Sequence, residues 1–394
     1  MKPREIRPRI YWVGAIDWDR RLFDSLIPLP DGTSYNAYLI FGSQKTALID
    51  TVDSTMKEVL ENNLDELAVK NIDYVVANHA EQDHSGSLPR VLERFPQAKA
   101  VTTPRGKDML MDLLMIPEDR FITVKDKETI SLGDKTLEFI HAPWVHWPET
   151  MLTYLREDRI LFPCDFFGSH LATSDLYVTD EGQVYEAAKR YYAEIMMPFR
   201  TSIQGHLNRL KDYAIDLIAP SHGPIYDKPE FIIKAYTSWV FDEPRNIVVL
   251  PYISMHGSTK KMVRYFVSAL AQKGVTVKQF DLAATDIGKL AMALVDAATL
   301  VVGTPTVLVG PNPNVAYAAL LANALRPKLK FVSIIGSYGW GGKVVEQLSA
   351  LIPNLKVEIL PPVICRGLPR PADFTALDNL ASSIAAKHKE HGLT

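Results

Sequence analysis

The segment His79–His84 constrains this chain more than any other, because four of its six side chains can bind a metal ion. These side chains are His79, Glu81, Asp83 and His84. An apolar run, Tyr74–Ala77, precedes the segment, and a second apolar stretch follows it. This order predicts a buried strand, a polar loop and the start of a helix. Alternation along an extended loop would turn the first three ligands to one side, with the last two near the helix N-terminus. So many metal-binding side chains after a buried strand favour a metal site over a solvated loop.

Three further candidate ligands follow predicted strands later in the chain. His146 follows the strand 137–142, Asp165 follows 159–162, and His222 follows 215–219. Loops at strand ends are where a rigid sheet displays functional groups. Taken alone, each residue could instead be a packed core histidine or a turn former. Their joint order after the first segment favours one metal site built from four loops.

The other histidines are treated separately. His170 could contact the metal ligands or have a purely structural role, and both interpretations stay open. His141 ends a predicted strand and is left out of the site. His206, His388 and His391 lie in helical or terminal polar segments and are predicted to be surface residues.

The motif His-x-Glu-x-Asp-His at 79–84 resembles the signature of the metallo-β-lactamase superfamily, in which the second position is usually a histidine. Here Glu81 stands at that position. Within the superfamily, the glutamate form is similar to that of the flavodiiron proteins, which join a diiron domain to a flavodoxin domain. The resemblance covers nearly the whole chain, from about Tyr11 to the C-terminal helix.

Length and composition agree with a two-domain α/β protein. A chain of 394 residues is too long for one ordinary core, and 47% hydrophobic and 23% charged residues are typical of globular proteins. The net charge of −3 gives no basic field for nucleic acid, and neither a membrane-length apolar run nor a signal-peptide core is present. Two cysteines cannot hold an iron–sulfur cluster or a rubredoxin iron, so such a donor would be a separate chain. We expect a cytoplasmic protein without nucleic-acid or membrane partners.

The N-terminal part, residues 1–244, is predicted to be a metallo-β-lactamase-like αββα sandwich, because short apolar strands dominate and helices lie between them. A single helical stretch is expected over 182–210. A polar, proline-bearing break at 242–245 marks the domain boundary. From 245 to 394, strands and helices alternate, which predicts a flavodoxin-like doubly wound parallel sheet.

Three loops in the C-terminal part are predicted to bind FMN. They follow the strands 247–250, 300–303 and 331–336, and the carboxyl ends of parallel strands are where such a sheet binds its ligand. The first loop opens a helix and resembles the phosphate-binding loop of flavodoxins, although a plain helix cap would look similar. Glycine-rich dinucleotide and nucleoside-triphosphate motifs are absent from the sequence. The predicted flavin residues are Ser254, Met255, His256, Gly257, Ser258 and Thr259; Thr304, Pro305 and Thr306; and Ser337, Tyr338, Gly339, Trp340, Gly341 and Gly342.

The resemblance to flavodiiron proteins implies an oxidoreductase that reduces dioxygen to water, or nitric oxide to nitrous oxide, at two iron ions. It implies that His79, Glu81 and His146 bind one iron and that Asp83 and His222 bind the other. Asp165 would bridge them. Family members differ in whether the residue matching His84 is a ligand. The resemblance also implies FMN, rubredoxin or reduced coenzyme F420 as electron donor, and a head-to-tail homodimer or a dimer of dimers.

Two other interpretations stay open from the sequence. One is a zinc- or iron-dependent hydrolase of the lactamase superfamily with a regulatory flavodoxin-like domain. The other is an electron carrier with a structural metal domain. Glu81 disfavours the hydrolase, since an anionic ligand in place of a neutral imidazole suits higher-valent iron. The set of seven ligands disfavours the carrier.

Overall fold

The computed structural model describes residues 2–393, which form two compact units. Unit 1 comprises the described chain up to Tyr192 together with Phe199–Val240. Unit 2 comprises Ala193–Pro198 and the chain from Phe241 onward. The predicted domain limits, 1–244 and 245–394, stay a prediction. Among residues 2–393, no helix has the length and apolarity that a membrane span needs.

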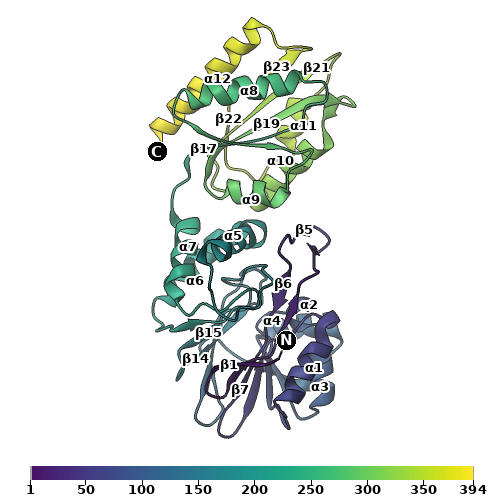
Figure 1. Cartoon of the computed structure of the whole chain (residues 1–394), viewed down its shortest axis with the longest axis vertical. Coiled ribbons are helices and arrows are strands. Elements are labelled where there is room, and N and C mark those ends of the chain that lie inside the picture. Colours follow the sequence, from purple (N-terminus) through teal and green to yellow (C-terminus); the bar gives the residue numbers. More distant parts are fainter. Residues whose placement is uncertain (1, 394) are drawn as a thin grey trace. The chain divides into compact units, whose positions relative to one another are not determined.

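Unit 1 contains two main sheets with helices on the outside, the predicted αββα arrangement (Figure 1). The seven-stranded sheet has the order β1 (Arg4–Arg7), β2 (Ile10–Trp12), β7 (Tyr38–Phe41), β8 (Thr46–Ile49), β9 (Tyr74–Val76), β10 (Lys99–Thr102), β11 (Phe121–Thr123). The five-stranded sheet has the order β12 (Thr129–Ser131), β13 (Thr136–His141), β14 (Met151–Leu155), β15 (Ile160–Phe162), β16 (Leu217–Ile218). Two small pairs are β3 (Ala15–Asp17) with β6 (Thr33–Tyr35), and β4 (Leu22–Phe23) with β5 (Ile27–Pro28).

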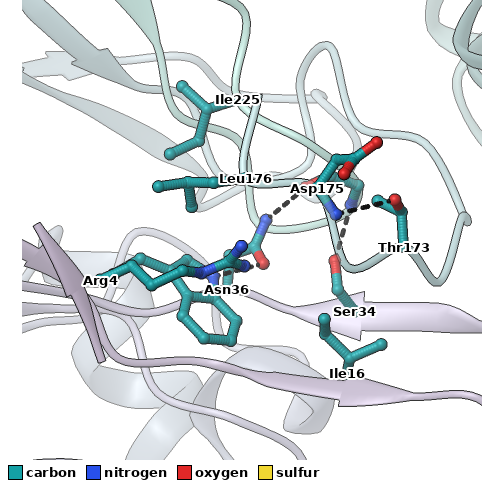
Figure 2. Close-up of a pocket in the computed structure, with 10 residues that line it drawn as sticks. Arg4, Ile16, Ser34, Asn36, Thr173, Asp175, Leu176 and Ile225 are labelled. Atoms are coloured by element: carbon teal, nitrogen blue, oxygen red, sulfur yellow. Dashed lines mark hydrogen bonds between the residues drawn. The ribbon is translucent and has the colours of Figure 1, made fainter. Parts of the chain in front are cut away.

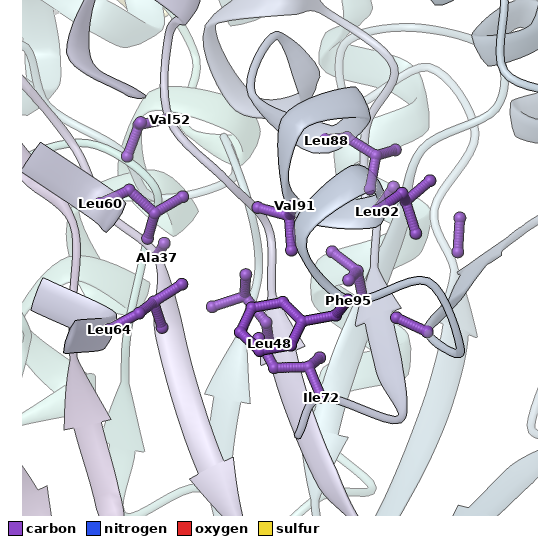
Figure 3. Close-up of a cluster of buried hydrophobic side chains, with 14 of the residues drawn as sticks. Ala37, Leu48, Val52, Leu60, Leu64, Ile72, Leu88, Val91, Leu92 and Phe95 are labelled. Carbon is purple, nitrogen blue, oxygen red and sulfur yellow. The ribbon is translucent and has the colours of Figure 1, made fainter. Parts of the chain in front are cut away.

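Side-chain alternation in the strands builds two cores. In β8, Leu48 packs with the helices, whereas Ala47 and Ile49 face the second sheet. The outer core is shown in Figure 3, where Leu60 and Leu92 approach Leu48 from two helices. Burying a side chain such as Leu48 stabilises the fold by roughly 1.5–3 kcal/mol. The helices are η1 (Ser54–Met56), α1 (Lys57–Glu66), α2 (Gln82–Ser85), α3 (Leu88–Arg94), α4 (Pro104–Leu114), η2 (Glu118–Arg120), α5 (Glu181–Tyr191), α6 (Arg200–Leu210) and α7 (Pro229–Phe241).

The helical stretch predicted over 182–210 is broken rather than continuous. Helix α5 begins after Asp180, whose side chain accepts a hydrogen bond from the Gln183 amide. It passes into a π-helical turn at Tyr192–Met196 and a 3₁₀ turn at Met197–Phe199 before α6 begins. Pro198 lies in this break and helps to explain it, because proline lacks the N–H group that a continuous helix needs. Single π-turns of this kind often lie beside functional sites.

Unit 2 is a parallel sheet with helices on both faces, as predicted (Figure 1). Its strands run in the order β18 (Thr276–Asp281), β17 (Arg245–Tyr252), β19 (Ala297–Val307), β21 (Phe331–Tyr338), β22 (Glu358–Ile359), while β23 (Val363–Arg366) also pairs with β21 and β20 (Gly310–Pro311) with β19. The helices are α8 (Ser258–Ala271), α9 (Ile287–Leu294), α10 (Pro313–Leu325), α11 (Val344–Ala350) and α12 (Pro371–Glu390). Helices α8 and α12 share one apolar core with the sheet.

Two predictions for unit 2 are wrong in detail. Thr304–Thr306 is part of β19 rather than a loop, because Thr306 and Val307 continue into a hairpin with β20. In the same way, Ser337 and Tyr338 belong to β21, because they pair with β23. His388 is buried rather than exposed. Its Nε2 lies 2.6 Å from the Thr299 hydroxyl and its Nδ1 lies 2.8 Å from Asn246 Oδ1, so both nitrogens are satisfied inside the fold.

Candidate metal centre and cofactor loops

The first group of predicted ligands is formed by His79, Glu81 and His146. Glu81 Oε2 lies 3.2 Å from His79 Nε2 and 3.0 Å from His146 Nε2. Asp165 Oδ2 lies 3.5 Å from His79 Nε2 and 3.3 Å from His146 Nε2. Two imidazoles and two carboxylates therefore direct one atom each toward a common point.

The second group is formed by Asp83, His84 and His222. Asp83 Oδ2 lies 3.1 Å from His222 Nε2, and Asp83 Oδ1 lies 3.3 Å from His84 Nε2. Asp165 Oδ1 lies 2.9 Å from His84 Nε2 and 3.4 Å from His222 Nε2. The ring of His84 is therefore turned toward the group and not away from it.

Asp165 joins the two groups, because each of its carboxylate oxygens faces a different pair of imidazoles. The structure brings all seven predicted ligands together. Asp83 and His84 lie on the short helix α2 instead of an extended loop. The helix turns them toward the second group, whereas His79 and Glu81 belong to the first. The simple alternation expected from the sequence is wrong at Asp83 for this reason.

The strands deliver these side chains from four separate points of unit 1. The loop that carries His79 follows β9, and His146 follows β13. Asp165 follows β15, and His222 follows β16. These four strands lie in both sheets, so the candidate centre depends on the packing of the sheets against each other.

Charge within the cluster shifts the titration of the imidazoles. Burial lowers the pKa of His146, but the neighbouring carboxylates of Asp165 and Glu81 outweigh this effect and raise the pKa to about 9. Burial also lowers the pKa of His222, and the neighbouring carboxylates of Asp165 and Asp83 outweigh this effect and raise it to about 10. Metal ions displace such protons, so a set of this kind binds metal more tightly as the pH rises.

The cluster fits metal ions better than it fits a closed hydrogen-bond network. Within residues 2–393, both carboxylate oxygens of Asp83, Oδ2 of Asp165 and both nitrogens of His84 are buried, and the close contacts that they make inside the cluster lack the geometry of hydrogen bonds. Buried polar atoms of this kind each cost roughly 1–3 kcal/mol unless something compensates them. Four imidazoles and three carboxylates suit iron, manganese or zinc. Cys164 also lies within ligand distance of His84, but burial raises the pKa of its thiol well above the usual value, which makes it a poor ligand.

Several residues that contact the ligands were not singled out from the sequence. Glu149 Oε1 lies 2.7 Å from His79 Nδ1. The Ser34 carbonyl lies 2.6 Å from His222 Nδ1, and Figure 2 shows that Ser34 and Asn36 line the same small hollow. The Tyr191 hydroxyl donates to Asp165 Oδ1 at 2.7 Å. In the sequence, Glu149 could have been noticed because it follows the predicted ligand His146 by three positions.

His170 lies against the site but belongs to neither group of ligands. Its ring centroid is 4.7 Å from that of His222, and its Nδ1 lies 2.9 Å from the Thr33 hydroxyl. Burial lowers the pKa of His170 well below its usual value, with a further contribution from His222, so the imidazole is neutral. The contact favours a role beside the ligands over a role elsewhere in the core.

In unit 2, the first predicted flavin loop precedes α8. Gly257 caps this helix with φ +88°, a conformation that favours glycine. The Ser254 hydroxyl accepts a hydrogen bond from the Lys260 amide at 3.1 Å. Met255 and His256 are exposed at the tip of the loop, and Ser258 begins the helix. The first backbone amides of α8 therefore lie beside the hydroxyl side chains of Ser254 and Ser258.

The structure brings the three predicted flavin segments to one end of the parallel sheet. The Thr259 hydroxyl lies 3.1 Å from that of Ser337, and Pro305 pairs with Ser337 across the strands. Gly342 has φ +151°, and a Cβ there would lie 2.6 Å from the Thr306 methyl group. An open hollow of about 360 Å³ lies at this place, lined in part by Thr306, Tyr338, Gly341 and Gly342. Gly339 and Trp340 are exposed, Trp340 to 81%.

Residues 33–223 match the family described as ODP family beta lactamase. The chain is 37% identical to the nitric oxide reductase of Moorella thermoacetica, over 98% of this chain and 99% of that protein. Among solved structures, it resembles the rubredoxin oxygen:oxidoreductase of Desulfovibrio gigas with a TM-score of 0.94 and 31% identity, over 99% of each chain. It also resembles the flavodiiron protein of Giardia intestinalis with a TM-score of 0.91 and 27% identity, over 100% of this chain and 99% of that one.

The chain belongs to the flavodiiron protein family. The similarity extends over both units, so it includes the metal cluster and the three segments at the end of the parallel sheet. The predicted fold class is thereby confirmed for this flavodiiron protein, and so is its assignment to the oxidoreductases.

Proposed function

We propose that this flavodiiron protein reduces dioxygen to water or nitric oxide to nitrous oxide at two iron ions in unit 1, with electrons passed through FMN in unit 2. The observation that carries the proposal is the carboxylate of Asp165, whose two oxygens face two separate groups of metal-binding side chains. Two metals held by one bridging ligand lie close enough to act on one small molecule. The names of the relatives support both gases as substrates.

In this proposal, His79, Glu81 and His146 hold the first iron, and Asp165 bridges it to the second. Asp83, His84 and His222 hold the second iron. The position of His84 Nε2, 2.9 Å from the bridging carboxylate, supports His84 as a ligand. When bound, a pair of irons supplies redox electrons that imidazole and carboxylate side chains cannot supply.

The protein's own residues prepare the place for that chemistry. Glu81 adds a negative charge where related hydrolases have a neutral imidazole, which favours the ferric state. Tyr191 donates to Asp165 Oδ1, which fixes the orientation of the bridging carboxylate. Phe23 lies 5.1 Å from His170 and 6.5 Å from His222 between ring centroids, and Trp147 packs edge-on against His79 at 4.9 Å. In this proposal, Phe23 limits the access of water to the second iron, and Trp147 limits its access to the first iron.

FMN is proposed to bind at the end of the parallel sheet in unit 2. Its phosphate would accept hydrogen bonds from Ser258, Thr259 and the first amides of α8. Tyr338 and Trp340 would lie against the flavin ring, and Gly341 and Gly342 would allow its close approach to the backbone. The fit rests on the open hollow and on the absence of bulk at these glycines.

The working unit is proposed to be a head-to-tail homodimer, alone or within a dimer of dimers. The metal ligands and the flavin segments lie in different units, and each unit exposes large apolar side chains near them. Trp144, beside the loop of His146, is 47% exposed, and Leu308 beside the flavin segments is 92% exposed. A two-fold interface could cover both kinds of surface at once. The donor is proposed to be a separate protein such as rubredoxin, or reduced coenzyme F420; the cytoplasmic location stays a prediction.

Metal analysis separates this proposal from the hydrolase interpretation. Protein from iron-sufficient cells should contain about two irons per chain. Stoichiometric zinc without iron in such a preparation would contradict the redox function. The same preparation should release FMN and no FAD when denatured.

A mixed dimer tests the proposed assembly. One chain would carry changes at Ser258 and Thr259 that abolish flavin binding, and the other would carry changes at His79 and Asp165 that abolish metal binding. Some activity should return in verified heterodimers, because the flavin of one chain would serve the metals of its neighbour. No recovery would show that electrons move within a single chain.

A further inference from the structure

The imidazoles that face the two metal positions have different partners on their other nitrogen. His79 Nδ1 lies 2.7 Å from the carboxylate oxygen Oε1 of Glu149. His222 Nδ1 lies 2.6 Å from the backbone carbonyl of Ser34. In both rings Nδ1–H donates the hydrogen bond, so Nε2 is left to face the metal position. The partner is an anionic side chain in the first case and a neutral peptide group in the second.

Glu149 is buried and tied into the fold at three points. Its Oε1 also accepts a hydrogen bond from the Ala80 amide at 2.9 Å, and its backbone carbonyl accepts one from the Thr103 hydroxyl at 2.9 Å. Both contacts of Oε1 are with N–H groups, as expected for an ionised carboxylate, which only accepts hydrogen bonds. Because His146 lies three positions before Glu149, the same residue links the loops of two ligands.

A glutamine at this position could accept the same two hydrogen bonds, so geometry alone does not require a charge. A carboxylate does more than an amide for a ligand imidazole. It withdraws the Nδ1 proton toward itself and makes Nε2 a stronger electron donor to a metal. The carbonyl of Ser34 has a weaker effect of the same kind on His222. The chain therefore distinguishes two metal positions that otherwise have similar ligands.

We propose that Glu149 is a positioning residue that fixes the orientation of His79 and, through its charge, strengthens metal binding at the first position relative to the second. The proposal rests on the two-metal centre described under the proposed function. It concerns metal affinity and the potential of one iron. Its tests therefore do not depend on which gas, if any, the protein reduces.

The test compares Glu149→Gln with the parent protein in the full-length, FMN-containing form after removal of metal. Zn²⁺ is titrated in competition with a chromophoric chelator. One of the two zinc equivalents should bind about 10–100-fold more weakly in the variant, the usual loss when a partner of a metal-bound histidine is changed. The other equivalent should keep its affinity. Glu138→Gln is the matched control, because Glu138 is a buried glutamate bonded to Arg156 and Tyr213 rather than to a ligand.

Unchanged affinity for both equivalents in Glu149→Gln, or equal weakening of both, would overturn the proposal. Near-ultraviolet circular dichroism and FMN content check that the variant folds. If it does not fold, Glu149→Asp takes its place, since it keeps the charge but shortens the side chain by one methylene and should weaken the same equivalent less.

A redox titration of the iron-loaded protein separates charge from structure. Removal of the negative charge should shift the midpoint potential of one iron to a more positive value in Glu149→Gln. Glu138→Gln should leave both potentials unchanged. An unchanged potential in Glu149→Gln would show that the residue acts only through packing and would contradict the role of its charge.

Discussion

The replacement Asn36→Ala should destabilise unit 1 severely, because the Asn36 side chain joins three segments behind the His222 loop. Its Oδ1 accepts a hydrogen bond from Trp12 Nε1 at 2.8 Å, and its Nδ2 donates to the carbonyls of Pro220 and Gly223, each at 2.8 Å. Figure 2 shows this side chain among the residues that line a small hollow. Asn36 is itself buried, with 3% of its surface exposed.

The magnitude follows from the partners that alanine would leave. The Pro220 carbonyl would keep the hydroxyl of Tyr38, which donates to it at 2.7 Å. The indole N–H of Trp12 and the carbonyl of Gly223 would each lose the side-chain partner described above. A buried polar group left without a partner costs roughly 1–3 kcal/mol, so the two together predict a loss of about 2–6 kcal/mol. That loss is a large share of the ~5–15 kcal/mol by which a typical domain is stable.

Urea denaturation followed by tryptophan emission measures this loss. Five of the six tryptophans lie in unit 1 and one, Trp340, lies in unit 2, so the signal reports mainly on unit 1. Asn208→Ala is the control, because Asn208 is exposed on α6 and its side-chain Oδ1 accepts a hydrogen bond from the flexible Lys211 Nζ at 2.8 Å. It should change stability by less than about 0.5 kcal/mol. A loss below about 1 kcal/mol in Asn36→Ala would refute the reasoning about buried partners.

Three further changes test the site and the fold. Asp165→Ala should lose both metals by elemental analysis, because one carboxylate faces both groups, whereas His84→Ala should lose less metal; two retained metals in Asp165→Ala would contradict the bridging role. Thr259→Val should weaken FMN binding in a fluorescence titration, since it removes a buried hydroxyl from the proposed phosphate loop, and an unchanged affinity would argue against that loop. Lowering the pH from about 6.5 to about 4 should destabilise unit 2, because burial lowers the pKa of His388 to about 4 and the unfolded chain therefore takes up a proton that the folded unit excludes. His388→Gln should reduce this dependence in melting curves recorded across that pH range, and an equally steep dependence in the variant would show that other groups cause it.

The strongest sequence signals were local. Apolar runs predicted strands over 137–142 and 159–162, each within one residue of the limits of β13 and β15, and the segment 79–84 gave four ligands at once. His222 was found because a histidine before Gly-Pro at a strand end repeated the order of the other ligands. In each case a few neighbouring residues carried the information, and the fold only had to bring these segments together.

Other features depended on contacts between distant residues, which a single sequence does not display. The break between α5 and α6 follows from Pro198, yet the π-helical turn before it has no local signature. His388 looked like a surface residue because its helix is polar, but Thr299 and Asn246 satisfy both of its nitrogens in the fold. Glu149 contacts His79 across 70 positions of sequence, so its role became visible only when the two loops were seen together.

Gas consumption by the fully loaded protein tests the proposed function most directly. Protein containing two irons and FMN per chain would be reduced chemically without air, and then mixed with measured amounts of dioxygen or nitric oxide. The iron-loaded parent should consume at least one of the gases catalytically and form water or nitrous oxide. Protein loaded with zinc in place of iron, and the FMN-containing Asp165→Ala variant, should consume neither beyond the slow reaction of free flavin. Consumption of both gases by the parent at no more than the rate of these controls would contradict a two-iron reductase.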